Sequence, residues 1–326
     1  MSRLRTPRIL EDPQGLYEPA GLVHQLVPRR VPFRVDIKVQ VALQFGRCCS
    51  LSDEEGIPRR SCPSFGAERL TGRCPHRFNY LLYKGDVDVI NLSVGGPDFA
   101  DEPFGDKVKE IVASGITLVS AMGNDGPAYG TLNAPGDAVE VIGVGASEAD
   151  SGRVAAISSR GFPLGDKIPR MKPDYLAPGM GVLGAIPGGA TCSPNHGTSV
   201  ASPSVAGVAA LVVSAARRAG TSVRNPAMVR QCLNEASSQT KESMWAQGFG
   251  RINSLKAVKC AETYVPRVTL VPDSFNLVKD CPYLAPLCDQ PLIRGGLPIS
   301  FNLTVLNGLG VLGSVSDMKW AGSTSV

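Results

Sequence analysis

Residues 86–126 read DVDVINLSVGGPDFADEPFGDKVKEIVASGITLVSAMGNDG, and this stretch decides the fold. Residues 87–92 form a short, mostly apolar run that is typical of a buried strand. Residues 104–114 place Val108, Ile111 and Val112 on one side of a helix. Residues 116–120 form a second apolar run. A strand, a helix and a strand within about 35 residues predict a βαβ unit and therefore a parallel sheet.

The sequence that follows continues the alternation of strands and helices. Residues 138–144 predict another buried strand, and a loop-rich stretch with many Gly and Pro residues comes after it. Three helices are then expected, at residues 197–218, 226–236 and 253–262. Pro226 fits the first turn of its helix, where a missing N–H costs nothing. The pattern predicts an α/β class for this part of the chain.

Charge and proline usage divide the chain into three expected parts. Residues 1–77 form a divergent basic segment of uncertain fold, because they hold 12 Arg and one Lys against eight acids. Their clearest pattern is a half-buried strand at residues 33–41. Residues 78–263 form the α/β domain. Residues 264–326 become strand-like among prolines and glycines, and about 60 residues would be only the start of a β domain.

Composition excludes several classes of protein. With 43% hydrophobic and 19% charged residues, the chain of 326 residues is globular rather than disordered or fibrous. A formal net charge of +4 is too small to indicate a nucleic-acid partner. The longest nearly apolar run covers residues 205–216, whereas a membrane span needs about 20 residues, so no span is expected. The first 20 residues also lack the apolar core of a secretory signal.

Nine cysteines show none of the paired spacings that are typical of zinc sites. Cys281 and Cys288 lie seven residues apart and are able to close a small disulfide loop in an oxidising compartment. Two reduced thiols are the alternative, and the sequence leaves both open.

The stretch NHGTSVASP, residues 195–203, leads directly into the longest predicted helix. A serine in the first turn of a buried helix lies where free backbone N–H groups and the positive end of the helix dipole converge. That position suits a nucleophile whose attack forms an oxyanion, which makes Ser199 the candidate. The alternative is that Thr198 or Ser199 only caps the helix.

Two further motifs follow predicted strands. Asn124 comes after the strand at 116–120, and at the carboxyl end of a parallel strand its amide would be able to donate to the same oxyanion. The alternative is a plain Asn-Asp-Gly turn. Ser93 to Gly96 end the first strand, and two glycines there leave backbone free to pair with an extended peptide. Its alternative is also an ordinary turn.

In this order the motifs resemble those of the subtilisin-like serine proteases, the subtilases of peptidase family S8. GTSVASP resembles the nucleophile motif of that family, which implies that Ser199 is the nucleophile. GND within SAMGNDG resembles the oxyanion-hole motif, which gives Asn124 that role. LSVGG resembles the strand that pairs with substrate, and the resemblance implies substrate binding by Ser93, Val94, Gly95 and Gly96. SSRG at 158–161 and KPDYLAPG at 172–179 also match the family.

The resemblance implies a serine endopeptidase of subtilisin-like, three-layer α/β fold that lacks the N-terminal part of the domain. Its partners would be protein or peptide substrates, including membrane-bound precursors, in the lumen of the ER or Golgi. No nucleic acid and no cofactor for the chemistry are expected. The family allows structural calcium, although nothing in the sequence supports a calcium site.

The acid and base of a subtilase triad are not recognisable in the sequence. The triad needs a histidine that takes the serine proton and a carboxylate that orients this histidine. His24 and His76 lack the Gly-Thr that opens the histidine motif of the family, and Asp36 lacks the Ser/Thr-Gly expected after the aspartate. HGTSVAS imitates the histidine motif, but His196 belongs to the nucleophile segment and is not expected to be the base for Ser199.

Two other classes were weighed against a protease. IGVGAS at 142–147 lacks the third glycine of a dinucleotide-binding fingerprint and no long helix follows it, which excludes that class. A catalytically inactive subtilase fragment, or a pseudoprotease that binds peptides without cutting them, remains the alternative, because the substrate strand is present while the acid-base pair is missing.

Overall fold

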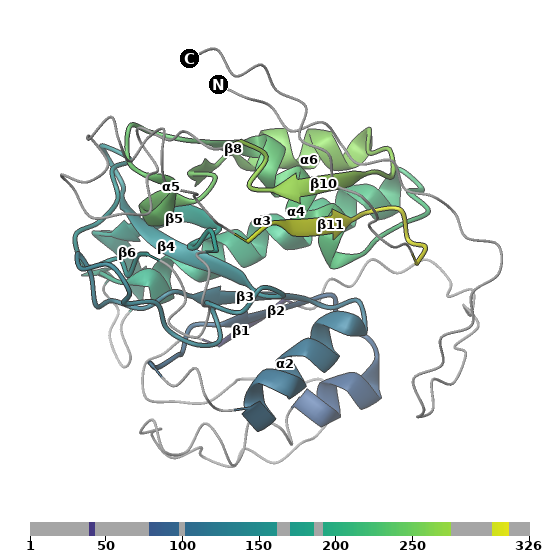
Figure 1. Cartoon of the computed structure of the whole chain (residues 1–326), viewed down its shortest axis with the longest axis horizontal. Coiled ribbons are helices and arrows are strands. Elements are labelled where there is room, and N and C mark those ends of the chain that lie inside the picture. The colour runs from purple at the N-terminus through teal and green to yellow at the C-terminus, as the bar shows by residue number, and fades with distance from the viewer. Residues whose placement is uncertain are drawn as a thin grey trace, which may run out of the picture.

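The computed structural model describes residues 39–42, 78–97, 102–161, 170–185, 192–274 and 302–312 (Figure 1). Residues 78–84 form a first helix. The other helices are α2 (Glu102–Ala113), α3 (Thr198–Arg218), α4 (Pro226–Ala236), α5 (Met244–Gln247) and α6 (Ser254–Glu262). The strands are β1 (Val39–Ala42), β2 (Val89–Leu92), β3 (Thr117–Ala121), β4 (Ile142–Glu148), β5 (Tyr175–Met180), β6 (Val182–Ala185), β7 (Cys192–Asn195), β8 (Ser237–Ser238), β9 (Arg251–Ile252), β10 (Val268–Val271) and β11 (Thr304–Asn307).

The main sheet has the strand order β1-β2-β3-β4-β5-β9-β8, and every pair from β1 to β9 is parallel. β2 and β3 pair in register, with Val89 opposite Thr117 and Leu92 opposite Ser120. The carboxyl ends of these strands therefore lie side by side at one edge of the sheet. The expected βαβ unit is confirmed, and α2 is its connecting helix.

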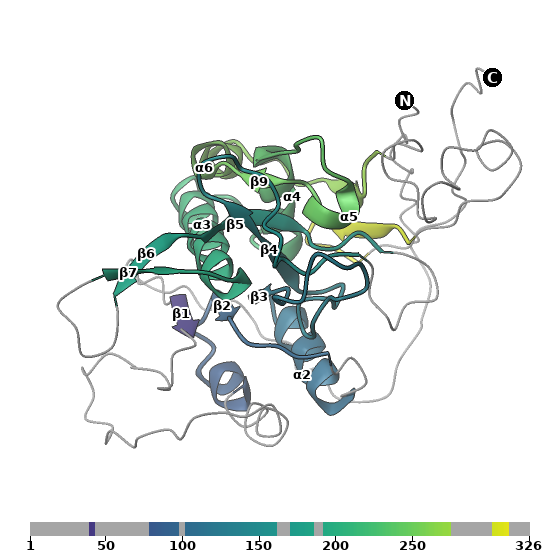
Figure 2. The ribbon, with the colours of Figure 1, turned by 90° about the vertical axis from the view of Figure 1, so that its left-hand side faces the viewer.

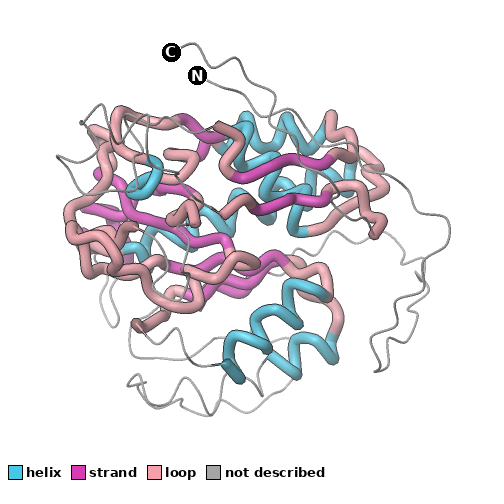
Figure 3. Tube along the Cα trace, viewed as in Figure 1, coloured by secondary structure: helices cyan, strands magenta, loops and turns pink. Residues whose placement is uncertain are grey.

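Helices cover both faces of the sheet, which confirms the expected three-layer α/β fold (Figures 2 and 3). Alternate strand residues point to opposite faces. Val89 and Val119 pack with α3, α4 and α6. Ile90 and Leu118 pack on the other face, in a cluster with Phe78, Leu92, Val108, Ile111, Ile116 and Val141.

Helix α3 lies at the centre of the larger core. It contacts β2, β3, β4 and β5 as well as α4 and α6. Its buried side chains are small, and they include Ala201, Ala206, Ala209, Ala210, Ala215 and Ala216. Among the described residues it is the one helix whose length and composition would allow it to cross a membrane, and 56% of its most apolar window is buried inside the protein. Alanines let the helix axis approach the sheet closely.

Two elements differ from the sequence prediction. The loop expected after residue 144 contains β5, a strand of the central sheet that holds Pro178 and Gly179. These residues normally interrupt strands, so the pattern hid an element that the sheet buries. The strand expected at 138–144 begins only at Ile142, because the residues before it form a turn.

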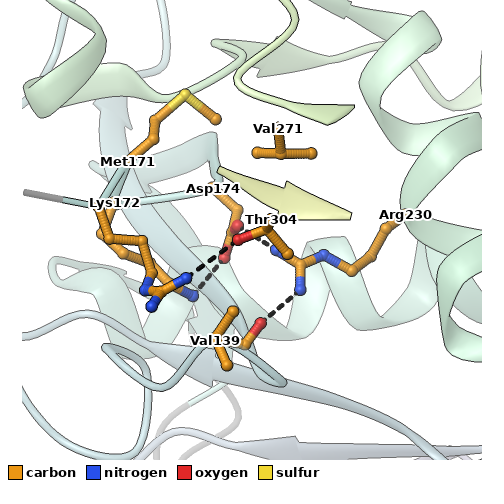
Figure 4. Close-up of a pocket in the computed structure, with 8 residues that line it drawn as sticks. Val139, Met171, Lys172, Asp174, Arg230, Val271 and Thr304 are labelled. Atoms are coloured by element: carbon orange, nitrogen blue, oxygen red, sulfur yellow. Dashed lines mark hydrogen bonds and ion pairs between the residues drawn. The ribbon is translucent and has the colours of Figure 1, made fainter. Parts of the chain in front are cut away.

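A cluster of buried ions fixes the position of β5 and α4 (Figure 4). The Asp174 carboxylate accepts from Lys172 Nζ at 2.7 Å, from Arg230 Nη2 at 2.6 Å and from the Gly143 N–H at 2.7 Å. The two cations also donate to backbone carbonyls of the turn at 139–141. Burial lowers the pKa of Lys172, while the charge of Asp174 opposes that shift. The Asp174 carboxylate thus pairs directly with both cations.

The hairpin of β10 and β11 packs against α4. Gln231 Nε2 on α4 donates to Arg267 O at 2.9 Å and to Leu306 O at 3.0 Å, so one amide holds both sides of the hairpin. A disulfide joins Cys232 on α4 to Cys260 on α6. The predicted pair of Cys281 and Cys288 lies outside the described residues.

We expect the disulfide to stabilise the fold. It closes a loop with a sequence separation of 28, so replacing Cys232 and Cys260 together by alanine should lower the free energy of unfolding by about 3 kcal/mol. Urea denaturation with and without dithiothreitol measures this difference. The double variant serves as the control, because the reductant should change its midpoint less than that of the wild type once this disulfide is absent. An unchanged midpoint of the reduced wild type would contradict the prediction.

The buried ion cluster gives a second prediction. Asp174→Asn keeps the shape of the side chain but leaves Lys172 and Arg230 without their shared counterion. Breaking a buried ion pair in this way typically costs about 3–5 kcal/mol. Denaturant unfolding should show a loss of that size, whereas Asp106→Asn, which removes an exposed ion pair with Lys109 on α2, should change stability by less than about 1 kcal/mol. Similar losses in the two variants would contradict this account.

Candidate active site

Ser199 is the second residue of α3, at the end of the helix that faces the carboxyl edge of the sheet. Its side chain is partly exposed. The residue before the helix, Gly197, has a φ of 136°, and its N–H donates to Gly179 O on β5 at 2.8 Å. Backbone of the central sheet therefore holds the chain as it enters the helix that carries Ser199.

Asn124 lies in the exposed loop after β3 and is tied to the same helix end. Its side-chain oxygen accepts from the Thr198 N–H at 2.8 Å and from Thr198 Oγ1 at 3.1 Å. The Gly123 N–H donates to Thr198 Oγ1 at 3.1 Å. Because the Thr198 N–H can only donate, the end of the Asn124 side chain that faces it is the oxygen and the other end is the NH₂ group. Thr198 thus turns the Asn124 NH₂ group away from the first N–H of the helix.

The Asn124 amide and the Ser199 hydroxyl border the same space. A Cβ atom built on Gly197 would lie 3.1 Å from Ser199 Oγ and 3.3 Å from Asn124 Nδ2. Ser199 Oγ and Asn124 Nδ2 both lie close to this one point, so they are near neighbours. A hydrogen-bond donor and a hydroxyl therefore flank one small space at the N-terminus of α3.

The segment from Ser93 to Gly96 continues from β2 beside this space. Gly96 and Ala134 exchange two backbone hydrogen bonds, at 3.2 and 2.8 Å. Gly95 lies so close to Ala134 that an added Cβ would come within 2.6 Å of its carbonyl oxygen. Val94 is partly buried and Gly95 is exposed. Because Gly96 already has a backbone partner, the part of the segment left for an extended ligand is Ser93 to Gly95.

The Ser93 side chain faces the protein rather than this edge. It is 1% exposed, and its hydroxyl donates to the backbone oxygen of Ser199 at 3.0 Å. Asn91 and Ser202 complete a buried polar group around it. Sequence reasoning did not single out these two residues. The sequence held one indication of this group, which is that Asn91 is a polar residue within a run expected to be a buried strand.

The position of His196 does not provide a base. The residue is exposed, and its Nδ1 accepts from the Gly181 N–H at 3.1 Å. It is the only histidine in the described part of the chain. His24, His76 and Asp36 lie outside the described residues. No group of three or more His, Cys, Asp or Glu side chains suited to a metal ion is present among the residues that the structure describes.

Two family models match the chain. The model of the subtilase family matches residues 71–251, and the model of the third Ig-like domain of MBTPS1 matches residues 271–325. The first covers β2 to β9 and all three motifs of the candidate site. The second begins at the end of β10.

Curated relatives match about three quarters of the chain. The chain is 44% identical over 245 residues to membrane-bound transcription factor site-1 protease of Homo sapiens, and 46% identical over 248 residues to subtilisin-like protease SBT6.1 of Arabidopsis thaliana. Each match covers 74% of this chain and 23% of the relative, so the chain spans less than a quarter of their length. Subtilisin E of Bacillus subtilis is 37% identical over 131 residues, which are 40% of this chain and 31% of subtilisin E.

Solved structures support the same architecture. The prenylagaramide maturation protease PagA superimposes with a TM-score of 0.50 at 27% sequence identity, over 63% of this chain and 70% of that one.

The space at Gly197 can be filled to test the geometry. Gly197→Ala would place a methyl group against Ser199 Oγ and Asn124 Nδ2 and would force an alanine into a φ of 136°. We expect a loss of about 1–3 kcal/mol in unfolding free energy and slower labelling of Ser199 by a fluorophosphonate. Gly207→Ala, in open space on the same helix, should be neutral or stabilising. Equal effects of the two substitutions would refute the crowding argument.

Proposed function

Because the chain belongs to the subtilase family, we propose that its site is that of a serine endopeptidase that works through an acyl-enzyme. The observation that carries the proposal is the placement of Ser199 Oγ and Asn124 Nδ2 around one space at the N-terminus of α3. The positive end of a helix dipole and a free amide both favour the negative charge that forms on a substrate carbonyl under attack.

The proposed reaction begins when Ser199 Oγ attacks the scissile carbonyl. Its proton passes to a general base, and the carbonyl oxygen becomes an oxyanion that Asn124 Nδ2 stabilises. The tetrahedral intermediate collapses as the base returns the proton to the departing amine, leaving an ester on Ser199, and water then hydrolyses that ester in the same manner. This chemistry needs no cofactor.

The proposed substrate is a protein segment that lies extended along Ser93 to Gly95 and adds a strand through its backbone. The likeness to membrane-bound transcription factor site-1 protease supports membrane-bound precursor proteins as substrates. We also propose a basic residue four positions before the cut and a leucine two positions before it, which is the preference that the resemblance to that protease implies. The same likeness supports the lumen of the ER or Golgi as the location. The Cys232–Cys260 disulfide fits that assignment, because such bonds persist in oxidising compartments.

No general base for Ser199 is found among the residues that the structure describes, and this favours a second candidate, a subtilase domain that binds peptides without cutting them. In the described part of the chain, the one histidine has its Nδ1 engaged by Gly181. A serine hydroxyl without a base is a weak nucleophile at neutral pH. In subtilisin, loss of the catalytic histidine lowers kcat by about 10⁶. We therefore expect the chain of residues 1–326 to turn over peptides near the limit of detection.

One experiment separates the two candidates. The purified chain is incubated with a fluorophosphonate probe and with a peptide that carries Arg and Leu at the stated positions, beside Ser199→Ala and Asn124→Ala. Slow labelling that Ser199→Ala abolishes, and that Asn124→Ala slows by about 10²–10³ as loss of the equivalent amide does in subtilisin, would support the endopeptidase site. Labelling that survives Ser199→Ala would refute it.

The peptide arm reports on the second candidate. Tight binding with no product and no labelling would establish a peptide-binding domain instead. Stoichiometric labelling with steady turnover would return His24, His76 or His196 to consideration as the base. Equal cleavage of peptides with and without Arg and Leu would argue for a different substrate class.

A further inference from the structure

A proline lies inside the helix that carries the candidate nucleophile. In an α-helix the carbonyl of residue i accepts the N–H of residue i+4. The residue four positions after Ser199 is Pro203, which has no N–H. The Ser199 carbonyl therefore lacks its intrahelical donor. A buried carbonyl without a partner typically costs about 1–3 kcal/mol, so another donor is expected in its place.

Ser93 supplies that donor from the end of β2. Its Oγ lies 3.0 Å from Ser199 O. Asn91 Nδ2 donates to Ser93 Oγ at 2.9 Å, and Ser202 Oγ donates to Asn91 Oδ1 at 2.9 Å. Asn91, Ser93 and Ser202 are each 1% exposed or less. The bonds among these three side chains are therefore buried, and the bond to Ser199 O is partly buried.

The hydrogens of this group can be counted. Each serine hydroxyl has one proton. If the Ser202 proton goes to Asn91 Oδ1, the Ser93 proton can go to Ser199 O or to Ser202 Oγ, which lies 3.1 Å away. Donation to Ser199 O supplies the hydrogen bond that Pro203 cannot make. Donation to Ser202 Oγ would leave the Ser199 carbonyl without that bond. The Asn91 amide, by donating to Ser93 Oγ, leaves the Ser93 proton free for this bond.

We propose that Ser93 is a positioning residue that replaces the missing N–H of Pro203 and locks the first turn of α3 to β2. The inference builds on the proposed function, since its purpose is to hold Ser199 Oγ in place relative to the substrate strand. Ser93 is the residue where that strand leaves β2. One hydroxyl thus joins the backbone that pairs with substrate to the backbone of the nucleophile, and the two move as one unit.

The test uses the full chain with Ser93→Ala, Pro203→Ala and the double variant. Pro203→Ala restores an N–H four residues after Ser199. If Ser93 acts as the substitute donor, Ser93→Ala should speed amide exchange at residues 199–202 by about tenfold in the wild type. In the Pro203→Ala background the same substitution should change it by less than about threefold, because the carbonyl has its own donor.

Ser120→Ala is the matched control. The Ser120 hydroxyl is equally buried, and it contacts Leu92 O at 3.1 Å and Ala121 O at 3.3 Å, both of them outside α3. It should leave exchange at residues 199–202 unchanged. The fluorophosphonate adds a second readout, in which Ser93→Ala should slow the labelling step about tenfold without weakening reversible binding of the probe.

The outcomes separate this inference from the proposed function. If the wild type is not labelled at all, the endopeptidase assignment fails while hydrogen exchange still tests the lock. An effect of Ser93→Ala that is equal in both backgrounds would overturn the lock and leave Ser93 as a space-filling residue. If Ser93→Ala fails to fold, recovery of folding in the double variant supports the lock, and failure of both variants overturns it.

Discussion

The packing of α3 against the parallel sheet is the interaction on which the rest of the structure depends. The helix presents alanines to β2, β3, β4 and β5, and it brings its first turn to the edge where those strands end. Three segments that are distant in sequence, at Ser93, Asn124 and Ser199, meet there as a result. A larger side chain on the buried face would push the helix away from the sheet and separate all three at once.

The polar groups around that helix turn are set by the close packing. Thr198 binds the loop after β3, and Ser93 binds the carbonyl that Pro203 leaves open. Each bond joins α3 to a different strand, so the two together fix the rotation and the depth of its first turn. Burial makes these bonds costly to break, because the separated groups have no water to replace the partner.

A second set of contacts supports the opposite side of α3, through α4 and α6. Asp174 ties β5 to α4, the disulfide ties α4 to α6, and Gln231 ties α4 to the hairpin of β10 and β11. α4 is thus the common attachment of the sheet and of the region that matches an Ig-like domain. Strands β10 and β11 also contact the segment before β5 and helix α5 directly, because Arg170 donates to Thr304 Oγ1 at 3.1 Å and Val271 and Leu306 pack with Met171 and Trp245.

The sequence by itself determined the α/β class and most of the helices, because apolar periodicity is local, and its motifs proposed the residues of the candidate site. It did not reveal β5, whose Pro178 is tolerated because β5 pairs there with β4 alone, whereas β9 lies opposite Leu176. It predicted that Ser93 belongs to a strand whose backbone pairs with substrate, and it did not reveal that the Ser93 hydroxyl faces α3. The partner of a buried hydroxyl depends on which helix covers the strand. The tertiary structure therefore decides that Ser93 contacts α3, as it decides that Cys232 pairs with Cys260.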